Sequence, residues 1–101
     1  MKNKAQQLLD VRLSTQRALW GMIYPEIRAI AVGLPNTTKL KVIVYLDRDP
    51  VETDYENIKE VTGEIAADIP ELNEFEEVCL FSQESINKLD NLDYWVYIRK
   101  E

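Results

Sequence analysis

The segment KLKVIVYL at residues 39–46 decides the fold, because its side chains alternate between two faces as they do in a β-strand. One face carries Leu40, Val42, Val44 and Leu46, and the other carries Lys39, Lys41, Ile43 and Tyr45. The preceding segment EIRAIAVGL (26–34) is also rich in apolar residues, and Pro35 and Asn36 supply turn chemistry between the two segments. The sequence therefore predicts a β-hairpin.

A helix is predicted before this hairpin, over residues 4–23. Its apolar residues recur with helical spacing, which predicts that one stripe is buried. The stripe consists of Leu9, Leu13, Gln16, Trp20 and Ile23, widened by Leu8 and Leu19. Pro25 is expected to stop the helix, because the residue before a proline is pushed out of the α region.

A second helix is predicted after the hairpin, from Thr53 to Ile69. Thr53 is a good N-cap with Glu56 in the capping-box position, and Pro70 ends the helix. The predicted buried face consists of Tyr55, Ile58, Thr62, Ile65 and Ile69, with Val61 and Ala66 at its edges.

Two more strands are predicted, FEEVCLF (75–81) and YWVYIR (94–99). The connection over residues 82–93 has an apolar residue at every third position, which indicates a short helical turn. The element order is then α-β-β-α-β-β. We expect an α+β fold in one domain, residues 1–101, with a four-stranded antiparallel sheet and both helices packed on one face.

Charge is distributed unevenly along the chain. The formal net charge is −6, which argues against a dedicated nucleic-acid binder or a polybasic membrane anchor. Residues 1–48 carry eight Lys/Arg and three Asp/Glu, whereas residues 49–101 carry four and fifteen. Such asymmetry suggests an interaction surface. With one cysteine and no apolar run long enough for a signal peptide or a membrane span, a cytoplasmic location is expected.

Catalytic and metal-binding patterns are weak. The chain has no histidine, the commonest general base and metal ligand, so Cys79 has no histidine to activate it and is expected in the core. The three glycines are scattered, so no phosphate-binding loop is predicted. The segment DRD at residues 47–49 lacks the glycine and the closing glutamate of a calcium loop. We expect neither an enzyme nor a bound cofactor or metal.

The acidic segment ETDYENIKEVTGEIAADIPE (52–71) gives the clearest functional signal. On a helix, Glu56, Glu60 and Glu64 fall on one stripe, with Asp68 at its flank. Like charges four residues apart destabilise a helix by ~0.2–0.5 kcal/mol per pair, and no Lys or Arg follows at the offsetting position. The stripe is either a solvated face that keeps the protein soluble or a docking surface for a positively charged partner.

An alternative is a nucleic-acid-binding module. Lys39 and Lys41 share a predicted strand face with Tyr45, and Arg28 could lie nearby on the neighbouring strand. A basic and aromatic sheet face can stack bases, although the acidic net charge opposes nucleic-acid binding.

Three segments carry a resemblance to a known family: RALWGMIYPEIRAIAV (17–32), EIAADIPE (64–71) and WVYIRKE (95–101). In this order and spacing they resemble the immunity proteins of contact-dependent growth inhibition and related polymorphic toxin systems. The resemblance covers nearly the whole chain. It implies a cytoplasmic antitoxin that binds and neutralises the toxin domain of a sibling cell's effector. It also implies that the shared residues serve the fold, namely Arg28, Asp68, Pro70 and Arg99.

The toxins of such systems are often nucleases, whose phosphate-binding clefts are basic. An acidic inhibitor would then associate quickly through electrostatic steering. The sequence therefore predicts a toxin-binding surface made of acidic residues. Its predicted members are Glu56, Glu60, Glu64 and Asp68, together with Glu74, Glu76 and Glu77.

Overall fold

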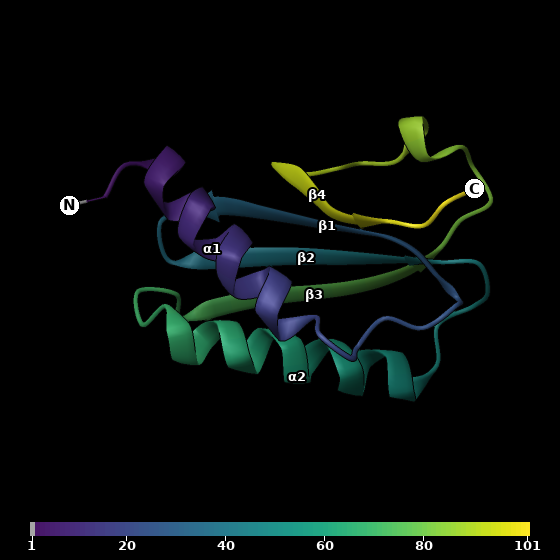
Figure 1. The fold of residues 1–101 in the computed structure, drawn as a ribbon, viewed down its shortest axis with the longest axis horizontal. Coiled ribbons are helices and arrows are strands. Elements are labelled where there is room, and N and C mark those ends of the chain that lie inside the picture. Colours follow the sequence, from purple (N-terminus) through teal and green to yellow (C-terminus); the bar gives the residue numbers. More distant parts are fainter. Residues whose placement is uncertain (1) are drawn as a thin grey trace.

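In residues 2–101, which the computed structural model describes, two α-helices pack on one face of a four-stranded sheet (Figure 1). The elements in order are α1 (Lys4–Ala18), β1 (Ile27–Asn36), β2 (Lys39–Leu46), α2 (Glu52–Asp68), β3 (Glu74–Phe81), the 3₁₀ helix η1 (Ile86–Lys88) and β4 (Tyr94–Ile98). Apart from η1, which stands between β3 and β4, this is the predicted order.

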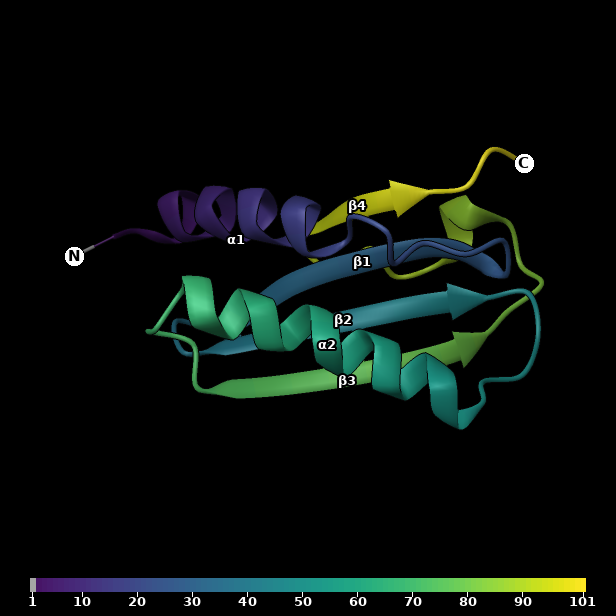
Figure 2. The same ribbon diagram turned by 60° about the horizontal axis from the view of Figure 1, so that its bottom comes forward.

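The sheet is mixed, so the prediction of a fully antiparallel sheet is wrong. The strand order is β3-β2-β1-β4, and β1 is antiparallel to both of its neighbours. β3 runs parallel to β2, with Glu74 opposite Lys39 and Phe81 opposite Leu46. The cause is α2, which carries the chain back along the sheet so that β3 starts at the same end as β2 (Figure 2). A helix between neighbouring strands is the usual connection of a parallel pair.

The main core lies between the helices and the sheet. The predicted hairpin is confirmed, with Ile30 opposite Val44 and Val32 opposite Val42. These side chains point toward the helices and are almost fully buried, as the alternation of residues 39–46 predicts. Cys79 on β3 also lies in this core, as expected.

Helix α2 buries most of its predicted face. Ile58, Val61, Thr62 and Ile65 are buried, but Tyr55 is 39% exposed at the open edge of β3. The N-cap is Val51 rather than Thr53, so the predicted capping box is wrong. The Asp54 carboxylate instead accepts a hydrogen bond of 2.8 Å from the Val51 backbone N–H, which satisfies one free donor of the first turn.

Helix α1 ends at Ala18, five residues before the predicted end. Leu19 caps it, and its backbone N–H still donates to the Thr15 carbonyl at 3.0 Å. Gly21 then adopts a φ of 74°, a left-handed conformation that glycine reaches without a steric penalty. Gly21 rather than Pro25 therefore turns the chain away from the helix.

The central residues of the predicted buried stripe of α1 face solvent, which corrects the sequence interpretation. Leu8 and Leu19, which were predicted to widen the stripe, do pack in or against the core. Leu9 is 58% exposed, Leu13 is 53% exposed and Trp20, just beyond the helix, is 77% exposed. The buried side is a stripe of smaller residues: Val11, Ser14, Thr15 and Ala18. Small side chains let α1 approach its neighbours closely, and hydrogen bonds satisfy the two buried hydroxyls.

The other face of the sheet is partly covered by the connection between β3 and β4. Apolar residues of this connection pack on a second cluster that includes Ile43, Tyr45 and Trp95. The connection comes close to β1 at Gly33, where an added Cβ would lie 2.9 Å from the Cβ of Leu92. A side chain at this position would collide, so glycine permits the crossing.

Candidate partner-binding surface

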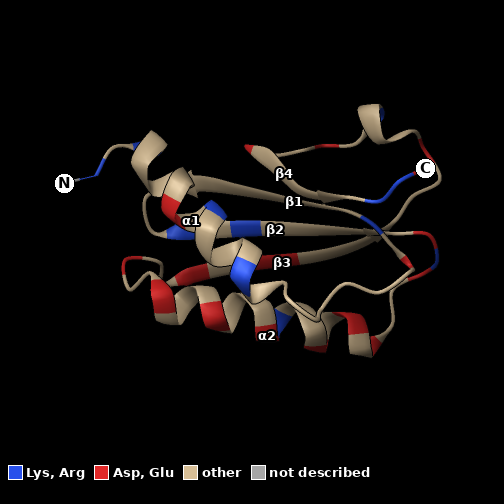
Figure 3. Ribbon diagram, in the orientation of Figure 1, with Lys and Arg blue, Asp and Glu red and all other residues tan. Residues whose placement is uncertain are grey.

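The predicted acidic stripe is present on the outer face of α2. Glu56, Glu60 and Glu64 are exposed at successive turns of this helix, and Figure 3 shows the acidic residues along it. We call these three residues the acid ridge. The opposite side of the helix carries Ile58 and Ile65 into the core, so the fold itself fixes the outward direction of the ridge.

The acid ridge has no ion-pair partner within the part of the chain that the structure describes. Among residues 2–101, no ion pair involves Glu56, Glu60 or Glu64, because most lysines and arginines pair with other acids. Several of these pairs join the basic half of the sequence to the acidic half, as Arg17 does with Asp68. These pairs offset part of the charge asymmetry of the sequence, and the ridge is among the acidic residues that they leave unpaired within residues 2–101.

The structure places the other four predicted contact residues differently. Asp68 extends the ridge, but its Oδ2 accepts hydrogen bonds from Ser14 at 2.7 Å and from Arg17 at 3.1 Å, which join the two helices. Glu74 is exposed at the start of β3. Glu77 lies under α2 and accepts a hydrogen bond of 2.6 Å from Thr62.

Glu76 lies on the opposite face of the sheet from the helices. It pairs with Lys39 at 3.1 Å and Lys41 at 3.4 Å, and hydrogen bonds from these lysines lower the pKa of its carboxyl group. Glu76 therefore contacts both lysines of the alternative hypothesis and offsets part of their positive charge. Their predicted aromatic neighbour, Tyr45, is buried, and its hydroxyl donates to the Asp90 carbonyl at 2.8 Å. Tyr45 offers no ring face for base stacking.

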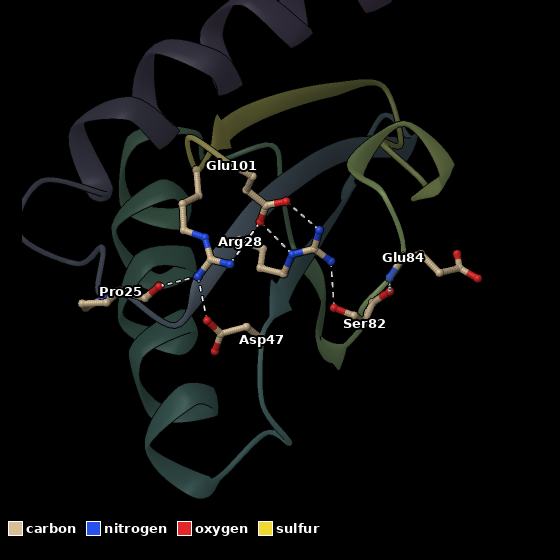
Figure 4. A network of polar contacts seen from close by, with 7 residues as sticks. Pro25, Arg28, Asp47, Ser82, Glu84 and Glu101 are labelled. Carbon is tan, nitrogen blue, oxygen red and sulfur yellow. Dashed lines mark hydrogen bonds and ion pairs between the residues drawn. The ribbon is translucent and has the colours of Figure 1, made fainter.

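Arg28 lies at the other end of β1 from the two lysines, where it is buried in a network (Figure 4). Its guanidinium donates to both carboxylate oxygens of Glu101 at 2.8 Å and to the Ser82 carbonyl at 2.7 Å. Arg99 donates to Glu101, to Asp47 and to the Pro25 carbonyl. The hydrogen bonds from Arg28 lower the pKa of Glu101 to about 2. Both arginines thus tie strand ends together, a structural role that agrees with the family resemblance.

A second polar network lies at the start of α2. Asp54 is only 2% exposed, and its carboxylate accepts hydrogen bonds from Arg48, from the Tyr24 hydroxyl and from the Val51 backbone. The bonds from Arg48 are the main cause of a lowered Asp54 pKa of about 2. Burial raises the pKa of Tyr24 to about 12. All of these groups satisfy one another, so the network holds the fold and leaves no group free for chemistry.

The sequence interpretation missed a groove between the two helices. The groove has a volume of about 260 Å³, and Leu13, Asp68, Ile69 and Glu71 are among its lining residues. It was missed because the apolar stripe of α1 was assigned to the core. A usable signal was the competing stripe of smaller residues from Val11 to Ala18, which has the same helical period.

Within residues 2–101, no cluster of three or more acidic, cysteine or histidine side chains could hold a metal ion. Burial raises the pKa of the Cys79 thiol to about 11, so it is not a reactive thiolate at neutral pH. In the same part of the chain, no helix combines the length and apolar character that crossing a membrane requires.

The fold is a small α+β domain with two helices on one face of a four-stranded sheet, and the comparison with known families is specific. A model that describes immunity proteins matches residues 9–101. The chain belongs to the MafI2 immunity protein family. This confirms the resemblance to immunity proteins of polymorphic toxin systems. The family implies a toxin-neutralising function with a cognate toxin as partner, and such families are generally not enzymes. A search of curated proteins found no match to the chain.

Proposed function

We propose that this protein neutralises its cognate toxin domain by direct, non-covalent binding, and that the acid ridge of α2 guides this association. The observation that carries the proposal is the ridge itself, three exposed carboxylates at successive turns of one helix that no ion pair within residues 2–101 engages. Carboxylates in this arrangement repel each other in the free protein. A basic partner would reduce this repulsion, which no ion pair within residues 2–101 offsets.

The expected partner has a basic contact surface, as the phosphate-binding cleft of a nuclease does. Opposite charges on two proteins raise their association rate by steering diffusional encounters, and salt screens this effect. We place the interaction in the cytoplasm, where a nuclease toxin would meet nucleic acid. The protein needs no cofactor or catalytic group for this function, since occupying or shielding the toxin is sufficient.

The first experiment identifies the toxin by co-expression with the domain encoded immediately upstream. We expect that domain to stop growth when it is expressed alone and to be tolerated together with this protein. A neighbouring domain that is harmless, or equally toxic in both conditions, would contradict the proposal.

The second experiment compares two charge-matched variants by association kinetics with that toxin domain. The ridge variant combines Glu56→Gln, Glu60→Gln and Glu64→Gln. The control combines Glu26→Gln, Asp49→Asn and Glu84→Gln, three acids outside the ridge that are not engaged in an ion pair. Both variants lose the same net charge, so only its position differs.

We expect the ridge variant to associate about tenfold more slowly than the control at low salt, because steering depends on charge near the contact. The difference should vanish at high salt. Equal association rates for the two variants at low salt would show that net charge matters and that the ridge does not.

A further inference from the structure

Three large apolar side chains remain on the outside of α1 after the fold is complete. Leu9 and Leu13 lie one turn apart, and Trp20 follows beyond the C-cap Leu19, whose backbone is still helical. All three are more than half exposed. We call Leu9, Leu13 and Trp20 the apolar stripe. At about 100° per residue, it lies on the side of the helix opposite buried residues such as Val11 and Ala18.

The apolar stripe contributes little to the fold. An exposed side chain already contacts water in the folded state, so its apolar area gives little stabilisation. Single exposed leucines are common on proteins, but an aligned stripe that ends in an exposed tryptophan is typical of an interaction site. Tryptophan is also among the residues that most often dominate the binding energy of protein interfaces.

The apolar stripe borders the same surface as the acid ridge. Both helices cover one face of the sheet and lie side by side, as Figures 1 and 2 show. Between them is the groove of about 260 Å³, with Leu13 on the α1 side and Asp68, Ile69 and Glu71 at the α2 end. Asp68 lies one turn beyond Glu64, and Arg17 of α1 pairs with it across the groove, so the apolar residues of α1 and the acidic residues of α2 border one surface.

We propose that the apolar stripe is the centre of the contact with the cognate toxin domain and limits its dissociation. The toxin would present an apolar depression for Leu9, Leu13 and Trp20, bordered by lysines or arginines that face the acid ridge. This inference rests on the proposed function and assigns separate roles to the two helices. The apolar stripe holds the complex through desolvated contacts, while the acid ridge brings the partners together.

Charge favours the toxin over a second copy of this chain as the occupant. A symmetric dimer through α1 would use the same surface on both copies. It would bring together two molecules that each carry a net charge of −6, so they repel each other overall. A basic toxin domain meets the same surface with attraction instead of repulsion.

The test measures dissociation from the toxin domain identified by co-expression. The stripe variant combines Leu9→Ala, Leu13→Ala and Trp20→Ala. A control variant combines Val51→Ala, Leu80→Ala and Phe81→Ala, which are also large exposed apolar residues but lie at the other edge of the molecule. Circular dichroism of all variants checks that each is folded, and sedimentation of the free proteins gives their oligomeric state.

We expect the stripe variant to dissociate about 100-fold faster, since hot-spot residues dominate binding energy, with an association rate near that of the unchanged protein. The control variant should dissociate at the unchanged rate.

Unchanged dissociation of a folded stripe variant would overturn the inference and leave the proposed function intact. A free protein that is dimeric, and becomes monomeric only in the stripe variant, would assign the stripe to a second copy. A toxin domain that does not bind the unchanged protein would overturn both proposals.

Discussion

α1 and α2 cover the same face of the sheet, but they use their apolar residues in opposite ways. α2 turns Ile58 and Ile65 inward and its glutamates outward. α1 turns Ser14 and Ala18 inward and Leu9 and Leu13 outward. The two helices are connected where they meet, through the bonds from Ser14 and Arg17 to Asp68.

The difference shows that an apolar stripe indicates a surface that is buried by some other element or partner. The stripe does not indicate which element or partner buries it. For α2 the cover is the sheet of the same chain. In α1 the smaller residues face the rest of the protein, where they allow close packing. The larger apolar residues Leu9, Leu13 and Trp20 face solvent. In a family that has a cognate toxin as partner, the partner is a natural candidate to cover them.

The largest expected effect is on the free energy of unfolding. It compares a buried residue on the inner face of α2 with an exposed residue of the apolar stripe on α1. Ile65→Ala removes a fully buried side chain and should lower the free energy of unfolding by about 2–5 kcal/mol. Leu13→Ala should change it by less than about 0.5 kcal/mol, because the side chain is already exposed. Urea unfolding measures both. A similar loss for the two variants would mean that the apolar stripe is buried in solution.

The next effect concerns pH and the network at the start of α2. Hydrogen bonds from Arg48 lower the pKa of Asp54 to about 2, below its ordinary value of about 3.9. A carboxyl group with a lowered pKa stabilises the folded state above the ordinary value, and this contribution is lost as pH falls toward 2. Glu101, whose pKa is also about 2, acts in the same direction. We therefore expect stability to fall between about pH 4 and pH 2.

The variant Asp54→Asn tests which group causes this fall. It should lower stability at pH 7, since the amide cannot replace the charged bonds to Arg48, and the loss should be much smaller near pH 2. Urea unfolding of both proteins across this range gives the two curves. Parallel curves for Asp54→Asn and the unchanged protein would show that Asp54 does not titrate in this window.

Much of the fold could be predicted from local sequence patterns. Alternation in residues 39–46 predicted which side chains face the helices, and the helical period of residues 53–69 predicted the core side of α2 except for Tyr55. The hairpin was also predicted correctly, although Ile43 and Tyr45 on the other sheet face are buried too. The direction of β3 could not be predicted, because a strand has the same alternation whether its neighbour is parallel or antiparallel. Only the spatial path of α2 decides it.

The buried side of α1 could not be predicted from hydrophobic pattern alone. Two stripes of the helix share the same period, and the pattern favours the one with larger apolar residues. The choice depends on the space between α1 and its neighbours, which selects Ser14 and Ala18 by their size.

For the acid ridge, the sequence predicted the exposure of Glu60 and its neighbours, since a helix that buries Ile58 and Ile65 must turn them outward. The intramolecular partners of Glu76 and Glu77 could not be predicted, because Lys39, Lys41 and Thr62 come from other elements.

The smallest expected effect concerns repulsion within the acid ridge, which should lower the stability of the protein when no partner is bound. Glu60→Lys replaces two like-charge pairs, with Glu56 and Glu64, by two opposite-charge pairs on the same helix face. Each pair changes the free energy by a few tenths of a kcal/mol, so stability should rise by about 0.5–1 kcal/mol at low salt. Thermal and urea unfolding at low and high salt measure the gain, which screening should remove.

Glu84→Lys is the matched control for this change, because it alters net charge equally at an exposed position away from α2. An equal gain in both variants would show that overall charge, not repulsion within the ridge, limits stability. If Glu60→Lys stabilises the free protein and also slows association with the toxin domain, the same carboxylate would be unfavourable for folding and favourable for binding. That combination would separate a docking surface from a merely solvated helix face, since a solvated face would show the gain in stability without any loss in association.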